Sequence, residues 1–300
     1  MIFRTDLAKE TYELRKEKKG IVSKRINSNG IEGDWVQILY DMEDSGKKAG
    51  NYISFETDAI INRNVEFYEN ISKALAEKIN ELIKETDKTV LVVGLGNESM
   101  TPDSIGPKVI KKIFVTRHIF EFLPDEKDQR MSSVCAVAPG VLGVTGIESA
   151  DVISGICRNI DVGAVIVIDA LAARKSERMF STFQLTDTGI HPGAGVGNKR
   201  SPLSKEFLGI PVIAIGVPTV VYASSLVYDA AMEFFDNSDK NEVTAEKIAQ
   251  KLASFSDRDM VVTPKEVDVI IEDCAKIIAD GINLSLQKNM SIDEINAYMF

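Results

Sequence analysis

The chain has 300 residues, 44% of them hydrophobic, and a formal net charge of −10 at pH 7. This length predicts one large domain or two small ones, and the hydrophobic fraction excludes a wholly disordered chain. The acidic balance argues against a general nucleic-acid-binding protein, because phosphate contacts favour a basic surface. The first residues lack the apolar segment of a secretion signal, and the longest mainly apolar run, residues 162–173, contains Asp169 and is too short to span a membrane. We therefore expect a soluble, cytoplasmic protein that binds no membrane.

The cysteines Cys135, Cys157 and Cys274 are widely spaced and odd in number. This usage predicts free thiols in a reducing compartment. None of them lies beside a histidine in the sequence, so a cysteine nucleophile is not expected.

The N-terminal quarter predicts three elements. Residues 3–18 carry apolar side chains at helical spacing and indicate a helix or a mobile arm. Residues 20–63 combine repeated glycines with short β-prone runs, which favours a small antiparallel element. Residues 66–86 have the apolar periodicity of an amphipathic helix.

Strands and helices alternate from residue 88 onward. The predicted strands are residues 89–95, 133–138, 162–168 and 210–217, with an antiparallel strand at 180–186. The predicted helices are residues 103–115, 146–159, 219–235 and 244–254, and a helix of roughly twenty residues from Pro264 with Thr263 as its N-cap. This alternation predicts an α/β fold, with a mostly parallel sheet sandwiched by helices and a small antiparallel β insertion.

Two aspartates follow predicted buried strands. Asp103 lies in the loop region after residues 89–95, and Asp169 comes directly after residues 162–168. Ligands bind where the carboxyl ends of parallel strands meet, so both side chains are expected at one crevice. Mutual repulsion would leave one of two such carboxyl groups protonated, and the pair could then activate water and protonate a carbonyl. The alternatives are a helix cap for Asp103 and a structural loop role for Asp169.

Gly94 and Gly96 resemble the start of a dinucleotide-binding fingerprint, which needs a third glycine three residues later. Ser99 occupies that position, so a nicotinamide or flavin site is not expected. The glycines instead allow a sharp turn after the strand, which Asn97 could orient through side-chain hydrogen bonds. No cofactor is expected.

Two glycine-rich loops are candidates for substrate binding. The first spans residues 138–146, where Gly140 and Gly143 could present backbone N–H groups to a substrate strand or an oxyanion. The second spans residues 191–200, where Lys199 and Arg200 could form an anion site, although it lacks the ending of a nucleotide-binding P-loop. His191 could make a polar contact or bind a metal ion, and either loop could equally be a compact connection.

These stretches together resemble the spore germination protease family. The resemblance covers nearly the whole chain and rests on residues 94–107, 138–148, 167–172, 189–200, 215–221 and 262–268. It implies an atypical aspartic-type endopeptidase whose core is similar to that of the hydrogenase maturation proteases. The two catalytic aspartates of the family match Asp103 and Asp169, and the resemblance implies no metal.

The resemblance also gives the N-terminus a role. Members of this family cut after the first acidic residue of a motif that begins Thr-Glu-(Ile/Phe)-Ala and has Glu two residues later. The segment from Thr5 to Glu10 has the same order of residues, with Asp6 in place of glutamate. This implies a zymogen that cuts itself between Asp6 and Leu7. The expected organisation is a prosegment, residues 1–6, and a single protease domain, residues 7–300, comprising the β element (20–63), a catalytic core (88–235) and C-terminal helices (243–300).

The implied substrates are the small acid-soluble spore proteins, and the implied location is the developing forespore and the spore core. The family further implies a homo-oligomer, a tetramer, with no direct contact to nucleic acid. An acidic residue before the cut bond calls for a basic site, for which Lys199 with Arg200, or Arg174 with Lys175, are candidates.

Two other functions remain open from the residues alone. Asp103, Asp169 and His191 could hold a metal ion, as in a metal-dependent maturation protease. The glycine-rich loops could also belong to a non-catalytic protein that binds a peptide or a nucleotide.

Overall fold

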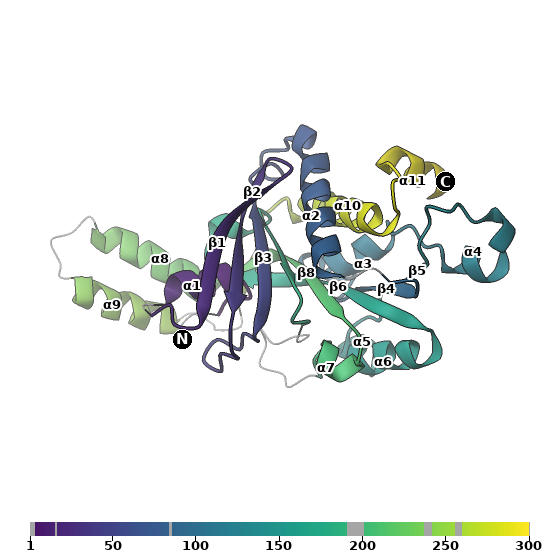
Figure 1. The fold of residues 1–300 in the computed structure, drawn as a ribbon. Coiled ribbons are helices and arrows are strands. Elements are labelled where there is room, and N and C mark those ends of the chain that lie inside the picture. Colours follow the sequence, from purple (N-terminus) through teal and green to yellow (C-terminus); the bar gives the residue numbers. More distant parts are fainter. Residues whose placement is uncertain are drawn as a thin grey trace.

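The structure, a computed structural model, describes residues 4–15, 17–83, 86–190, 201–236, 242–255 and 260–299. The strands form a mixed sheet in the order β1-β2-β3-β7-β8-β6-β4-β5, with β9 paired to β8. Helices cover both faces of this sheet (Figure 1), so the expected α/β class is confirmed.

The strands are β1 (Ile21–Ser28), β2 (Ile31–Ile38), β3 (Gly50–Glu56), β4 (Thr89–Gly94), β5 (Val134–Val137), β6 (Val162–Ala173), β7 (Thr182–Thr186), β8 (Val212–Tyr222) and β9 (Val261–Val262). The helices are α1 (Ala8–Leu14), α2 (Tyr68–Leu82), α3 (Ile105–Ile110), α4 (Arg117–Phe122), α5 (Leu142–Thr145), α6 (Ser149–Asn159), α7 (Lys205–Leu208), α8 (Ala223–Asp236), α9 (Glu242–Phe255), α10 (Val267–Leu286) and α11 (Ile292–Met299), with single 3-10 turns η1 (Val65–Phe67), η2 (Thr101–Asp103), η3 (Pro124–Glu126) and η4 (Ser176–Arg178).

The expectation of a mostly parallel sheet is wrong. Strands β8, β6, β4 and β5 pair in parallel, whereas the pairings β1·β2, β2·β3, β3·β7, β7·β8 and β8·β9 are antiparallel. The predicted antiparallel insertion is present, but it continues the main sheet because β3 pairs with β7. A two-residue turn at Asn29 and Gly30, both with positive φ, closes its first hairpin.

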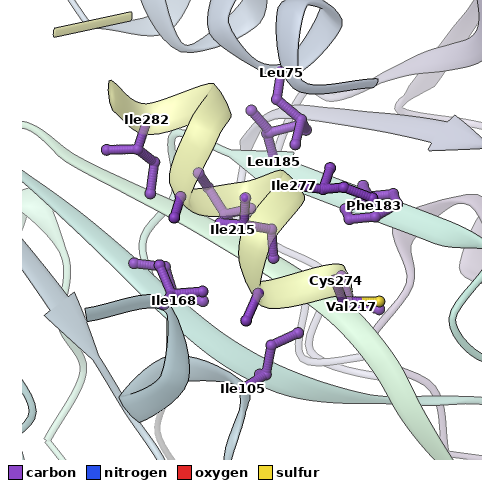
Figure 2. Close-up of a cluster of buried hydrophobic side chains, with 14 of the residues drawn as sticks. Leu75, Ile105, Ile168, Phe183, Leu185, Ile215, Val217, Cys274, Ile277 and Ile282 are labelled. Carbon is purple, nitrogen blue, oxygen red and sulfur yellow. The ribbon is translucent and has the colours of Figure 1, made fainter. Parts of the chain in front are cut away.

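The main hydrophobic core lies between the sheet and helices α2, α3 and α10. Figure 2 shows α10 crossing over strand residues such as Ile168 and Ile215, and next to Leu75 of α2. The opposite face of the parallel strands packs against α6, with Leu91 and Val167 in a second cluster. Helices α8 and α9 pack against each other and extend away from the sheet (Figure 1).

The ends of several predicted helices differ from the structure. The helix expected at residues 219–235 begins at Ala223, because β8 continues to Tyr222. The helix expected at residues 103–115 ends at Ile110, because Asn283 of α10 binds the next main-chain groups: its Oδ1 accepts the Phe114 N–H at 2.9 Å and its amide donates to Lys112 O at 3.0 Å. The helix expected from Pro264 begins at Val267. Thr263 is not its N-cap, since its hydroxyl donates to Thr219 O on β8.

Strand β6 is longer than predicted. The apolar run ends at Ile168, but the strand continues to Ala173 because its backbone stays paired with β8. Asp169 is therefore inside β6, opposite Gly216, and does not follow the strand. Strand β4 ends beside it, since Gly94 pairs with Ile168, so Asp169 still lies at the carboxyl end of β4.

Candidate active site

Asp103 is held by the loop that follows β4. After β4 the chain turns at Gly96, whose φ of 111° only glycine adopts readily. It then forms the short 3-10 turn η2. The Asp103 carboxylate accepts the N–H of Asn97 at 2.8 Å, and the Asn97 side chain accepts the N–H of Ser99 at 3.0 Å. Ser104 is the N-cap residue of α3, and the Asp103 carboxylate organises the loop that precedes it.

Gly94 and Gly106 bring α3 against the end of β4. A Cβ on Gly94 would lie 2.2 Å from Gly106 O, and a Cβ on Gly106 would lie 2.1 Å from Leu95 O. Neither position can carry a side chain without displacing the backbone. These glycines thus serve the close packing of strand, loop and helix.

Asp169 lies next to this loop on the adjoining strand. Its carboxylate accepts the N–H of Ala170 at 2.9 Å, and the preceding residue, Ile168, accepts the N–H of Leu95 at 2.8 Å. Both Asp103 and Asp169 are half-buried. Because η2 packs against β6 and β8, the two predicted catalytic aspartates are on elements in direct contact at the carboxyl end of β4.

The predicted cleavage site is hydrogen-bonded to β6, the strand that contains Asp169. Asp6 N–H donates to Ala172 O at 2.9 Å, and Ala172 N–H donates to Asp6 Oδ2 at 2.8 Å. Leu7 is completely buried. The segment continues into α1, so the helix expected within residues 3–18 is present but is confined to Ala8–Leu14.

Two residues that the sequence did not single out contact the Asp6 carbonyl oxygen. Lys47, in the β2–β3 connection, donates from Nζ at 2.6 Å, and Gln184, on β7, donates from Nε2 at 3.0 Å. Burial lowers the pKa of the Lys47 ammonium, while the carboxylates of Asp6 and Glu10 act in the opposite direction. The one sequence feature that could have indicated Gln184 is its polar side chain between Phe183 and Leu185 in a predicted strand.

The other predicted binding residues lie in three places. Asn97 is beside Asp103, as described above. Gly140 and Gly143 belong to the connection after β5, where Gly140 has a φ of 77° and its carbonyl accepts the Ser149 hydroxyl at 3.1 Å. His191, Lys199 and Arg200 lie outside the described residues.

Arg174 and Lys175, one of the two candidate basic sites for the residue before the cut, lie near the N-terminal segment. Their backbone N–H groups bind the Glu10 carboxylate at 2.7 and 2.9 Å, and the Arg174 guanidinium pairs with Asp229. In the described part of the chain, no cluster of three or more histidine, cysteine or acidic side chains could hold a metal ion, and no helix is long and apolar enough to cross a membrane.

Comparison with known proteins identifies the family. The germination protease family model matches residues 3–257 and 240–299. The chain belongs to the germination protease family. Germination proteases of Clostridium acetobutylicum and Clostridium tetani are 42% and 40% identical to it, over 99% and 100% of this chain and 98% and 100% of theirs. That of Halalkalibacterium halodurans is 37% identical over 98% of this chain and 96% of its own.

Among solved structures, the NiFe hydrogenase maturation protease HycI from Thermococcus kodakarensis is similar to 68% of this chain and 98% of its own, with a TM-score of 0.34 and 14% identity. The germination proteases are peptidases, so the enzyme class expected from the sequence is confirmed at that level.

Proposed function

We propose that this member of the germination protease family is a self-activating endopeptidase that begins the degradation of small acid-soluble, DNA-binding spore proteins during germination. It cuts after an acidic residue and uses Asp103 and Asp169 as its catalytic pair. The observation that carries the proposal is the packing of η2 on β6, which brings both aspartates to the carboxyl end of β4. The forespore and spore core are its place of action, and a homotetramer is its assembly.

The reaction needs one carboxylate and one carboxylic acid. The ionised aspartate removes a proton from water as the water oxygen attacks the peptide carbonyl carbon, while the protonated aspartate donates its proton to the carbonyl oxygen. Collapse of the tetrahedral intermediate breaks the C–N bond as the aspartate that took the water proton donates it to the leaving nitrogen, and the other aspartate recovers its proton from a hydroxyl of the intermediate. Two carboxyl groups close together favour such a state, because repulsion disfavours ionisation of both.

The first substrate is the chain's own N-terminus. Cleavage between Asp6 and Leu7 would release residues 1–6 as a prosegment. Two observations support this site: Asp6 is hydrogen-bonded to Ala172 of β6, and the carbonyl of the bond accepts from Lys47 and Gln184.

Mass spectrometry of the purified chain tests the proposal. The unsubstituted protein, Asp103→Asn and Asp169→Asn are incubated at mildly acidic and neutral pH, with and without a strong chelator. We expect loss of residues 1–6 in the unsubstituted protein alone, unaffected by chelation. Cleavage in both variants would contradict the aspartate mechanism, and activity lost on chelation and restored by a divalent cation would favour a metal-dependent protease.

A further inference from the structure

Leu7, the residue that follows the proposed cut, is fixed in place. Its side chain is completely buried, and its carbonyl oxygen accepts the N–H of Thr11 at 3.1 Å. The N–H of the next residue, Ala8, donates to Gln184 Oε1 at 2.7 Å. These contacts lie outside residues 1–6, so Leu7 and α1 keep their position when that segment is removed.

The carboxylate of Glu10 lies close to the nitrogen of Leu7. Thr5 connects the two groups, because its hydroxyl donates to Glu10 Oε2 and its oxygen accepts the Leu7 N–H at 3.0 Å. Leu7 is the N-cap residue of α1 and Glu10 comes three residues later, the spacing at which a glutamate side chain reaches back to an N-cap nitrogen. A single hydroxyl group therefore stands between this nitrogen and a carboxylate.

The main chain after β6 holds the Glu10 carboxylate on its other side. Glu10 is 1% exposed, and its carboxylate accepts the N–H of Arg174 at 2.7 Å and that of Lys175 at 2.9 Å. A buried carboxylate that loses a hydrogen-bond donor is destabilised unless another donor takes its place. Loss of Thr5 with the prosegment removes such a donor.

Hydrolysis of the bond between Asp6 and Leu7 creates a replacement. Addition of water leaves a new carboxylate on Asp6, which departs with the prosegment, and an α-amino group on Leu7. The ordinary pKa of an α-amino group is about 7.7–8.0, so most of it is a cation at neutral pH. Hydrogen bonds between an ammonium and a carboxylate are shorter and stronger than those of a neutral hydroxyl.

We propose that the Leu7 ammonium takes the place of the Thr5 hydroxyl on Glu10, and that this ion pair holds α1 against the end of β6 in the processed enzyme. The pair forms only after the cut, so a released peptide must displace a charged group in order to rebind. The inference rests on the proposed function, because self-cleavage creates this terminus.

Lys47 is the alternative partner for Glu10. Its Nζ lies 2.6 Å from the Asp6 carbonyl oxygen, an acceptor that leaves with the prosegment. Arg178 is a weaker candidate, since its Nε is 3.9 Å from Glu10 Oε1 and its Nη2 donates to Glu13 at 2.7 Å. The charged side chains around the carboxylate are those of Lys47, Arg178, Glu13, Glu56 and Arg174, the last of which pairs with Asp229.

Four chains test the ion pair. A ubiquitin-like protein fused directly before Leu7 is removed by its specific hydrolase after folding, which gives residues 7–300 without any need for the chain's own activity. A second fusion leaves one glycine before Leu7, so that the Leu7 nitrogen is again an amide and the ammonium is displaced. Both forms are made with Glu10 and with Glu10→Gln, and thermal unfolding at pH 7 is measured for each.

The added glycine should lower the thermal midpoint by about 4 °C or more when Glu10 is present, and by less than about 1 °C in Glu10→Gln. The reason is that only the chain with Glu10 has an ion pair to lose. Glu13→Gln is the matched control, because Glu13 also lies on α1 but pairs with Arg178, and the glycine should cost as much there as in the parent. Equal effects of the glycine with Glu10 and with Glu10→Gln would overturn the proposal.

Lys47→Gln separates the two possible partners. With Leu7 as the partner, the glycine lowers the midpoint whether or not Lys47 is present. A glycine that has no effect in the parent but lowers the midpoint in Lys47→Gln would assign the carboxylate to Lys47 and overturn the proposal.

The pH dependence provides a second measurement that leaves Glu10 unchanged. A carboxylate partner raises the pKa of the Leu7 ammonium above its unfolded value of about 8, so the ion pair stabilises the fold below that pH and is lost as the pH rises through the folded pKa. The difference in midpoint between the two termini should be full at pH 7 and approach zero near about pH 10.5. The charged side chains named above are present in both chains, so their titration cancels from this difference. A difference that does not change with pH would reduce the glycine effect to a steric one and overturn the ion pair.

These outcomes are separable from the proposed activity. The expected midpoints in the released chains, together with a full-length chain that never cuts itself, would retain the ion pair and reject self-cleavage. Self-cleavage before Leu7 with no dependence on Glu10 would do the reverse.

Discussion

Gly96 positions Asp103 because only a residue without a side chain fits there. A Cβ at this position would lie 2.0 Å from the Asp103 carbonyl oxygen and 3.2 Å from its Oδ1. The φ of 111° would add backbone strain in any other residue. The orientation of the proposed catalytic carboxylate therefore depends on the glycine at position 96.

Gly96→Ala should reduce peptidase activity more than it reduces stability. The added methyl must displace η2, and a shift of about 1 Å in a catalytic group can cost about 10²-fold in rate. The strain itself should cost about 1–3 kcal/mol of unfolding free energy. Peptide hydrolysis and chemical denaturation measure the two effects.

Gly155→Ala is the control for this substitution. It lies in α6, where an added Cβ meets nothing within 4 Å, and alanine is the better helix former. It should keep full activity and unfold no more easily than the parent. Full activity in Gly96→Ala would show that the loop tolerates the displacement and that Asp103 is not tightly positioned.

The residues of the site were predictable to different degrees. Asp103 and Asp169 were singled out because each follows a predicted buried strand, and at Asp169 a carboxylate next to an apolar run is costly unless it has a partner. Lys47 and Gln184 were missed because their contacts are to the main chain of a segment about 40 and 180 residues away, and such contacts leave no spacing pattern. The cleavage segment was found from the family resemblance alone.

At the level of elements, periodicity predicted most strands and helices but not where they end. Strand β6 continues past its apolar run because β8 supplies hydrogen-bond partners up to Val221. The helix after Asp103 stops because Asn283 captures its next backbone groups. Both limits are set by distant partners, which a local pattern does not contain.

The C-terminal helix α11 is attached by an ion-pair network that predicts a pH effect. Arg130 lies 2.9 Å from Asp128 and 2.8 Å from Glu294 of α11. Its hydrogen bonds lower the pKa of Asp128 to about 2 and that of Glu294 to about 2. Since the folded values lie below the unfolded ones, the network stabilises the fold above about pH 4.5, and this stabilisation is lost as the pH falls toward 2.

Arg130→Gln should therefore lower the thermal midpoint at neutral pH, and the difference from the parent should shrink as the pH falls from 4.5 to 2. The effect should be modest, because these side chains are exposed and screened by solvent. Thermal unfolding at a series of pH values measures it. Lys24→Gln removes a positive charge that lies over the Trp35 ring, and serves as the control. A difference between Arg130→Gln and the parent that does not depend on pH would contradict the network.

On the scale of the whole molecule, the net charge of −10 decides how the enzyme meets its proposed substrates. DNA is a dense polyanion, so an acidic enzyme is repelled from DNA-bound protein and gains nothing from scanning the duplex. The proposed cut bond lies beside β6, where the Asp6 N–H donates to Ala172 O, so a substrate in the same place needs an extended, accessible segment. Free substrate should thus be cut faster than substrate on DNA.

Cleavage of one DNA-binding spore protein, free and saturated with duplex DNA, tests this expectation. The rate on the complex should rise with salt, because counterion release weakens the substrate's hold on DNA, whereas the rate on free substrate should change little. A short peptide that contains the cleavage motif but does not bind DNA is the control, and DNA should not alter its hydrolysis. Equal rates on free and bound substrate at low salt would mean that the cut segment stays accessible on DNA, and that the charge of the enzyme does not determine which form it degrades.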